Sequence, residues 1–159
     1  MRNLMQWKIF IITSVWVVAT VIVPLLESNA NLNSISWTLL CLERGCLVFM
    51  IALAFDRRDI VADEQEGIRT LPVSSGVKKT AEYFSMAASL LAVLILIQFV
   101  LYQFQPAVAL AMLLSAAAAY VICRRADAGR TDFYFSFAVD GIMLLQTALV
   151  WLAVEQKLV

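Results

Sequence analysis

Five long apolar stretches dominate the 159-residue sequence and restrict the folds open to it. A helix that crosses the hydrocarbon of a bilayer needs about 20 mostly apolar residues, and each stretch supplies about that length. Because a backbone inside a bilayer must satisfy its own hydrogen bonds, we expect helices in all five. The expected spans are residues 7–26, 35–55, 81–102, 106–123 and 133–154. The sequence therefore predicts an all-α integral membrane bundle of five transmembrane helices, with residues 1–159 forming a single membrane domain.

A proline separates the third span from the fourth. The uncharged run between Glu82 and Arg124 is too long for one crossing. It is interrupted at Tyr-Gln-Phe-Gln-Pro, which ends at Pro106. Proline is tolerated in the first turn of a helix, where its missing N–H would have no intrahelical partner. We therefore expect the fourth span to begin at Pro106.

The first span has an alternative interpretation as a signal peptide. Basic residues precede it, and Ser28-Asn29-Ala30 resembles a cleavage site. The apolar core of a signal peptide is about 7–15 residues long. The run from Trp7 to Leu26 is longer and contains two tryptophans, so a retained span is the favoured interpretation.

The overall charge excludes several classes of function. Basic and acidic residues are balanced, with 12 of each, whereas a nucleic-acid-binding protein shows a basic surplus. We therefore expect no nucleic-acid partner. The sequence has no histidine, which excludes a histidine-based triad and a histidine metal site. The three cysteines lie in apolar runs without C-x-x-C spacing, so we interpret them as small buried side chains.

Lysine and arginine in the connecting segments predict the orientation of the chain in the bilayer. The loops after the first and third spans carry none. Ten of the 12 basic residues lie at the N-terminus, after the second span and after the fourth, at Arg2, Lys8, Arg57, Arg58, Arg69, Lys78, Lys79, Arg124, Arg125 and Arg130. Basic loops face the cytoplasm. We expect a protein of the inner or plasma membrane whose N-terminus and polar loop 56–80 are cytoplasmic, with the C-terminus on the opposite side.

The polar loop contains three aspartates with helical spacing. Asp56, Asp59 and Asp63 are spaced i, i+3 and i+7, so a helix that continues past Phe55 would place them on one face. Carboxylates stacked in this way repel one another unless a cation binds. Mg²⁺ takes oxygen ligands and commonly bridges one or two carboxylates to phosphate oxygens. The spacing therefore suggests a metal site for a lipid diphosphate, although a charged loop beside a membrane span is also an ordinary structural feature.

The same loop resembles a known family motif. The stretch D-R-R-D-x-x-x-D-x-x-x-G-I-R-T-L-P, from Asp56 to Pro72, resembles the second aspartate-rich motif of UbiA-type membrane prenyltransferases. The surroundings of Lys8, of Glu43-Arg44 and of Asp140 are similar to other helices in one branch of that family. The resemblance covers nearly the whole chain and corresponds to spans five to nine of a nine-span bundle.

The resemblance implies a substrate and a set of binding residues. Members of the family bind a polyprenyl diphosphate through Mg²⁺ and transfer the prenyl group to an acceptor inside the bundle. Carried onto this chain, it implies that Asp56, Asp59 and Asp63 are metal ligands and that Arg69 contacts the diphosphate. Lys78 and Lys79 are neighbouring cations that could contribute to substrate binding. The resemblance gives no role for Lys8 or Asp140.

The sequence departs from the family in lacking the first aspartate-rich motif. The early polar stretch ESNANLNS contains no aspartate and is expected on the wrong side of the membrane. Catalysis needs preorganised charge on the leaving diphosphate, so we expect no prenyl transfer by this chain alone and assign no catalytic residue. A protein that supplies the missing N-terminal half would complete the site. The alternative is a non-catalytic five-span membrane protein or an inactive remnant.

Charged residues also occur within the expected spans. Glu43 and Arg44 lie in the second span and Asp140 lies in the fifth. A charged side chain at the bilayer centre costs about 2.5–3.5 kcal/mol on insertion scales and usually faces a bundle interior. We expect Arg44 to form an ion pair with Glu43 or Asp140 that holds helices together, and a catalytic role of these charges is the less favoured alternative.

Overall fold

The computed structural model describes residues 7–28, 34–102 and 105–155. Within these ranges, five helices are long and apolar enough to cross a membrane. They span Lys8–Glu27, Ile35–Arg58, Leu71–Leu101, Pro106–Arg125 and Tyr134–Glu155. The prediction of an all-α membrane bundle is confirmed, and the chain is an integral membrane protein.

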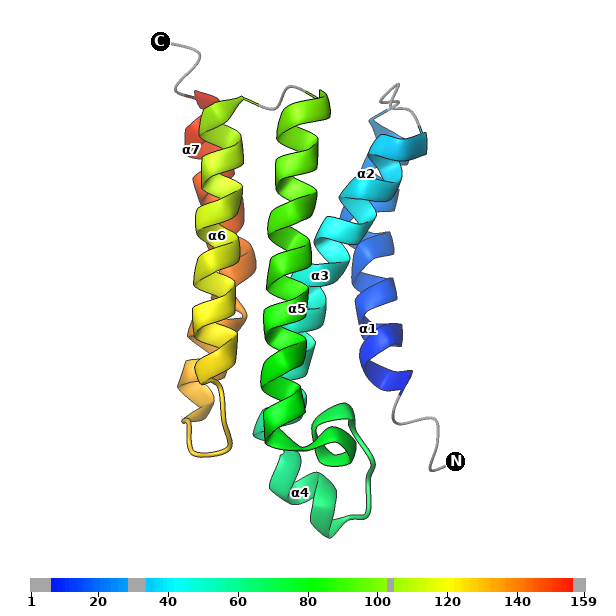
Figure 1. Ribbon diagram of the computed structural model, residues 1–159, viewed down its shortest axis with the longest axis vertical. Coiled ribbons are helices and arrows are strands. Elements are labelled where there is room, and N and C mark those ends of the chain that lie inside the picture. The colour runs from blue at the N-terminus through cyan, green and yellow to red at the C-terminus, as the bar shows by residue number, and fades with distance from the viewer. Residues whose placement is uncertain (1–6, 29–33, 103–104, 156–159) are drawn as a thin grey trace.

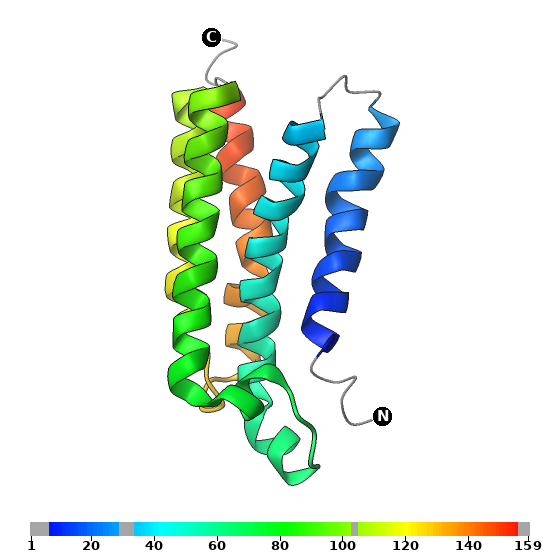
Figure 2. The ribbon, with the colours of Figure 1, turned by 45° about the vertical axis from the view of Figure 1, so that its right-hand side comes forward.

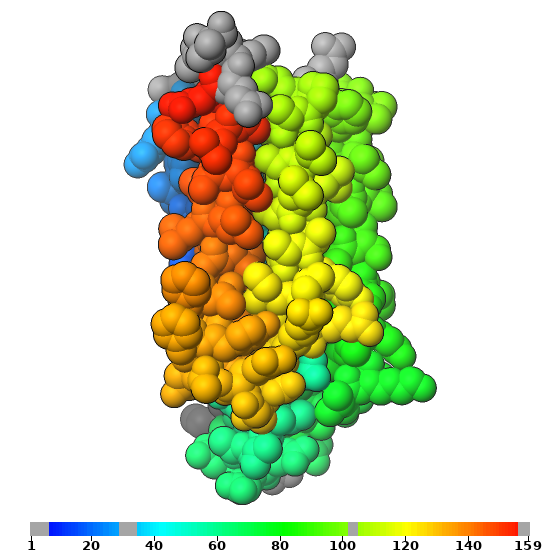
Figure 3. Space-filling view, turned by 90° about the vertical axis from the view of Figure 1, so that its left-hand side faces the viewer, coloured from blue at the N-terminus to red at the C-terminus, as the bar shows by residue number. Residues whose placement is uncertain are grey.

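The spans form a bundle in which the second span is central. Figure 1 shows α3 (Ser34–Arg58) between the first span and α5 (Leu71–Tyr102), α6 (Pro106–Arg125) beside α5, and α7 (Gly141–Glu155) behind α6. The view in Figure 2 separates the first span from the other helices most clearly. Figure 3 shows α6 and α7 side by side along the height of the bundle. α3 contacts the first span, α5 and α6.

The first span is built from three consecutive helical segments. α1 covers Lys8–Val17, the π-helix η2 covers Val18–Ile22, and α2 covers Val23–Glu27. Pro24 lies in the first turn of α2, where its missing N–H does not interrupt an intrahelical bond of α2. Over residues 7–28, the buried side chains are those of Ile9 and Val21. The first span therefore packs loosely, and most of its apolar surface faces outwards.

The second span is packed much more tightly. Leu47, Met50, Leu53 and Ala54 follow helical spacing and are fully buried. In a bilayer, lipid tails are as apolar as these side chains, so close packing and hydrogen bonds hold the helices together. The core of the bundle therefore lies along α3, α5, α6 and the first part of the last span rather than along α1.

The segment that connects α3 to α5 is largely helical rather than an irregular loop. α3 continues to Arg58, and Arg57 and Arg58 in its last turn favourably oppose the helix dipole. The short helix α4 covers Ile60–Gln65. α5 begins at Leu71 but breaks at Gly76, whose φ of 78° and ψ of 165° are accessible mainly to glycine.

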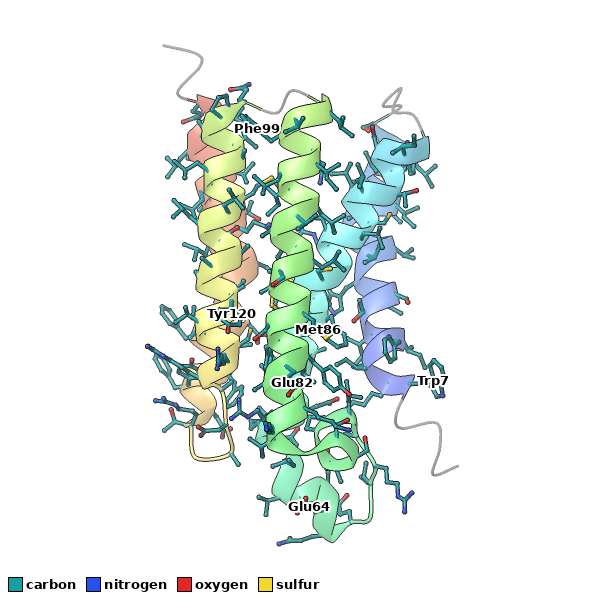
Figure 4. All side chains as sticks on the ribbon, viewed as in Figure 1. Trp7, Glu64, Glu82, Met86, Phe99 and Tyr120 are labelled. Atoms are coloured by element: carbon teal, nitrogen blue, oxygen red, sulfur yellow. The ribbon has the colours of Figure 1, made fainter. Side chains whose placement is uncertain are left out.

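Two ends of the bundle can be distinguished by these connections. We call the end that carries α4, the start of α1 and the turn 126–133 the α4 end. Figure 4 shows Glu64 on α4 below the bundle and Trp7 pointing outwards from the start of the first span. All the basic residues of the described segments lie at or near this end except Arg44.

The last span contains a π-helix. η3 covers Tyr134–Val139, and the N–H of Asp140 donates to the carbonyl oxygen of Phe135 at 3.0 Å. α7 then continues from Gly141. Single-turn π-helical segments often occur at functional sites, and this one ends at the only aspartate of the described last span.

Candidate functional site

The three aspartates of the motif lie at the junction between α3 and α4. Asp56 is in the last turn of α3 and is only 6% exposed. Asp59 separates the two helices with φ of −86° and ψ of 4°, and its carbonyl oxygen accepts from the N–H of Asp63 at 2.8 Å. The helix is therefore kinked at Asp59 rather than continuous through Asp63. Asp59 and Asp63 remain close enough to Asp56 to interact with it electrostatically.

Asp56 is held by a lysine from another span. The ammonium nitrogen of Lys8, at the start of α1, lies 3.5 Å from one carboxylate oxygen of Asp56. The side chain of Lys8 is 46% exposed. This ion pair joins the loosely packed first span to the central helix, and it gives Lys8 a role that the sequence did not predict.

Asp59 is held by its neighbour. The guanidinium of Arg58 donates to both carboxylate oxygens of Asp59, at 2.7 and 3.3 Å. The same guanidinium lies 5.2 Å from the ring centres of Phe55 and of Phe135. A cation over an aromatic face is attracted by the ring quadrupole. Arg58 therefore connects the end of α3 to η3.

A pocket of about 370 Å³ opens beside Asp56, and we call it the α4-end pocket. Three charged side chains line it, those of Lys8, Asp56 and Asp140. The rest of its wall is apolar and comes from the first, second and last spans, at Ile12, Trp16, Val48, Ile51, Ala52, Phe55 and Met143. The pocket therefore combines an apolar interior with two carboxylates and one ammonium group.

Asp140 lines this pocket and directly follows the π-helix η3. The i to i+5 bond between Asp140 and Phe135 closes the wide turn at which η3 ends. Asp140 is exposed and also interacts electrostatically with Arg58. The sequence showed Asp140 only as a charge in a span, and spacing could not reveal that it shares a pocket with Asp56.

The predicted substrate-binding cations lie outside this pocket. Arg69 follows the turn at Gly67, and Lys78 and Lys79 follow the break at Gly76. All three side chains are exposed, and none of them lines the α4-end pocket. Next to Arg69, the hydroxyl of Thr70 is buried and has no hydrogen-bond partner in the described part of the chain.

The side chains at the α3–α4 junction are of the type that binds Mg²⁺. Their carboxylate oxygens are the ligands that Mg²⁺ prefers, and Mg²⁺ needs only one or two of them beside water and phosphate. Residues 7–28, 34–102 and 105–155 nevertheless contain no group of three or more Asp, Glu, Cys or His side chains placed to hold a metal ion together. In this conformation, Asp56 and Asp59 are each paired with a cation of the chain.

The intramembrane charges find amide partners instead of each other. The guanidinium of Arg44 donates to the side-chain oxygen of Gln146 on α7 at 3.0 Å. The carboxylate of Glu43 accepts from the amide of Gln98 on α5. The ion pairs within the described ranges are Lys8–Asp56 and Arg58–Asp59, so the expected pairing of Arg44 with Glu43 or Asp140 is wrong. Gln98 and Gln146 each stand in an otherwise apolar run, which was the available signal.

Comparison of the chain with protein-family models, with curated proteins and with solved structures finds no match.

Proposed function

We propose that this chain binds a polyprenyl diphosphate as part of a UbiA-like membrane prenyltransferase. The α4-end pocket is the observation that carries the proposal, because it joins charged side chains to apolar walls. A polyprenyl diphosphate has the matching chemistry, with an anionic head and an apolar chain. The volume of about 370 Å³ lies within the roughly 300–1,000 Å³ that is usual for ligand pockets.

The charges of the pocket indicate how the head would bind. Asp56 and Asp140 face one lysine, so a bare diphosphate would be repelled. Mg²⁺ held by Asp56, Asp59 and Asp63, once they are drawn closer together than in the described conformation, would remove this repulsion and neutralise charge on the leaving diphosphate. Lys8 holds the Asp56 carboxylate in position and adds a positive charge at the same place. Arg69, Lys78 and Lys79 are exposed at the α4 end and would offer further cations to phosphate oxygens.

The proposed reaction is the transfer of a prenyl group. The bond between the first prenyl carbon and the diphosphate oxygen breaks, and its electron pair leaves on the diphosphate. The acceptor then attacks the allylic cation and loses a proton, which the released diphosphate can take up, while apolar side chains such as Trp16 and Phe55 exclude water from the cation. We propose that a protein carrying the first aspartate-rich motif completes the site, because one motif provides only part of the charge stabilisation.

The distribution of basic residues supports an orientation of the chain in the membrane. Lys8, the connection 56–80 and the turn 126–133 lie at the α4 end, and basic connections face the cytoplasm. We therefore propose that the α4-end pocket faces the cytoplasm of the inner or plasma membrane. The described C-terminal end of α7 would then lie at the opposite surface.

A non-catalytic five-span protein is the second candidate. Two ion pairs favour it, because Lys8 and Arg58 already balance Asp56 and Asp59. In that case the aspartates would only help to fix the end of α3. This candidate predicts no effect of Mg²⁺ on any ligand affinity.

Binding measurements separate the two candidates. The wild-type chain in nanodiscs is titrated with farnesyl diphosphate, with and without Mg²⁺, by calorimetry. We expect Mg²⁺-dependent binding that Asp56→Asn with Asp59→Asn weakens by about tenfold or more, as for lost interactions with charged groups. A matched control is Glu64→Gln with Glu66→Gln, which removes two exposed charges from the same connection.

The control variant should bind like the wild type. Equal farnesyl diphosphate affinity of the wild type with and without Mg²⁺ would contradict the proposal and favour the second candidate. Inorganic pyrophosphate, titrated in the same way, measures how much of the affinity comes from the head. We expect it to bind more weakly than farnesyl diphosphate, because it leaves the apolar walls uncovered.

A further inference from the structure

A second pocket lies between α3, α6 and α7, away from the α4 end. Its volume is about 520 Å³, and we call it the Arg44 pocket. Its polar lining is Arg44, Gln146 and Thr147, and apolar side chains such as Val108, Met112 and Trp151 form the rest. None of these residues belongs to the aspartate-rich motif or to the α4-end pocket.

Arg44 brings a positive charge into this pocket without an ion-pair partner among the described residues. A guanidinium has five N–H donors, and the Arg44 hydrogen bond that the structure records is to the amide oxygen of Gln146. No carboxylate of the described residues lies within ion-pair distance of it. The adjacent Glu43 is buried, and its carboxylate accepts from Gln98 on α5. The positive charge that faces the pocket is therefore unmatched by a direct anionic contact.

The pocket combines a cation, which can bind an anionic group, with an apolar wall that extends from Gln146 towards the end of α7. Glu155, at the helix end, follows Gln146 by nine positions on α7, which corresponds to about 14 Å of helix. Val150 and Val154 line the wall over this length, and Trp151 at the same end is 59% exposed. A charged group at this depth draws water and polar groups into the bilayer. The acyl chain of an amphiphile can lie along this wall, and its head would move down from the membrane surface to Arg44, where the charge already draws in water and polar groups.

We propose that the Arg44 pocket binds one membrane amphiphile with an anionic head. Carboxylate or phosphate oxygens of the head accept from the Arg44 guanidinium, whose planar fork favours two parallel hydrogen bonds to such groups. The Gln146 amide fixes the guanidinium in place, and the acyl chain lies against the walls from α6 and α7. This site is independent of the proposed prenyltransferase function.

Tryptophan quenching tests this proposal directly. Trp7, Trp16 and Trp37 are replaced by phenylalanine, so that Trp151 is the remaining tryptophan. The protein is placed in phosphatidylcholine vesicles that contain a small fraction of brominated oleate, brominated phosphatidylglycerol or brominated phosphatidylcholine. Bromine quenches Trp151 when the brominated chain occupies the pocket. We expect an anionic brominated lipid to quench at a lower mole fraction than brominated phosphatidylcholine.

Charge variants distinguish a binding site from a structural contact. With Arg44→Gln, brominated oleate and brominated phosphatidylglycerol should quench Trp151 no better than brominated phosphatidylcholine does. The apparent affinity of the pocket for the anionic lipids should then be lower by roughly tenfold or more. Arg130→Gln is the matched control, because it removes an exposed cation at the opposite end, and it should keep the preference. If the Arg44–Gln146 contact only holds helices together, the protein that retains Arg44 should be quenched equally by all three brominated lipids. That result would overturn the proposal.

The unsubstituted pocket also gives a test that does not depend on the folding of a variant. Unbrominated oleate or phosphatidylglycerol, added to vesicles with the brominated form, should restore Trp151 fluorescence. Stronger competition by oleate assigns the head as a carboxylate, and stronger competition by phosphatidylglycerol assigns it as a phosphate. Restoration that is no greater than with phosphatidylcholine would contradict the site.

Discussion

The α4-end pocket and the Glu43–Arg44 region differ in the partners that hold their charged side chains. At the α4 end, Asp56 is paired with Lys8, which is half exposed and belongs to the loosely packed first span. In the middle of α3, Glu43 and Arg44 are held by the buried amides Gln98 and Gln146 of the tightly packed helices. The comparison indicates that the Glu43–Gln98 and Arg44–Gln146 hydrogen bonds stabilise the core. The Lys8–Asp56 ion pair, in contrast, lies where the structure can adjust to a ligand.

The largest stability effect is expected in the core. Gln98→Leu leaves the buried Glu43 carboxylate without its hydrogen-bond donor, and an unsatisfied buried charged group costs about 2–3 kcal/mol. The midpoint of reversible denaturation in mixed micelles should fall accordingly. Gln65→Leu is the matched control, because Gln65 is exposed on α4, and it should change stability by less than about 0.5 kcal/mol. Equal changes in stability for the two variants would contradict the conclusion that the Glu43–Gln98 hydrogen bond stabilises the core.

A smaller effect is expected at the α4 end. Lys8→Met removes the cation that pairs with Asp56. Because Lys8 is 46% exposed, water replaces part of the lost interaction, and the free energy of unfolding should fall by about 1 kcal/mol or less. Exchanging the two charges, with Lys8→Asp and Asp56→Lys, should recover part of the loss in the same denaturation assay. A loss from Lys8→Met as large as that from Gln98→Leu would remove the distinction between the two regions.

The smallest effect is expected where the first span meets α3. A Cβ added at Gly45 would lie 3.8 Å from methyl groups of Thr13 and Val17, which is ordinary contact. Gly45→Ala should therefore stabilise the protein by roughly 0.5–1 kcal/mol, because alanine is the better helix former and fills space beside the first span. Gly141→Ala adds a Cβ that meets nothing within 4 Å, so it isolates the backbone contribution. A destabilising Gly45→Ala would show that the first span packs more closely than described.

The sequence predicted five membrane-spanning helices because their determinants are local, although the third helix begins at Leu71, within the polar loop expected over residues 56–80. Apolar length is sufficient to locate a transmembrane helix, and α6 begins at Pro106 because proline suits a first turn. The kink at Asp59 and the π-helix before Asp140 were not predicted, since both depend on how α3 and the last span pack against their neighbours. No spacing rule distinguishes such departures from a regular helix.

The site was predicted less completely because its partners are remote in sequence. Lys8 and Asp56 meet only through the packing of the first span against α3. The sequence analysis considered only charged partners for Arg44, whereas the structure supplies Gln146 from the last span. The aspartates, in contrast, follow one another along a single segment, so their spacing alone identified them as candidates. Their binding of Mg²⁺ and a diphosphate stays a prediction.

Photolabelling tests most directly whether the α4-end pocket holds a prenyl chain. A farnesyl diphosphate analogue with a diazirine in its chain is irradiated with the wild-type protein in nanodiscs, and the labelled residues are identified by mass spectrometry. The account predicts Mg²⁺-dependent labelling of the pocket wall at Ile12, Ile51 or Met143, suppressed by excess farnesyl diphosphate. Labelling that is independent of Mg²⁺ and falls on outward-facing residues such as Leu144, which is 76% exposed, would contradict it.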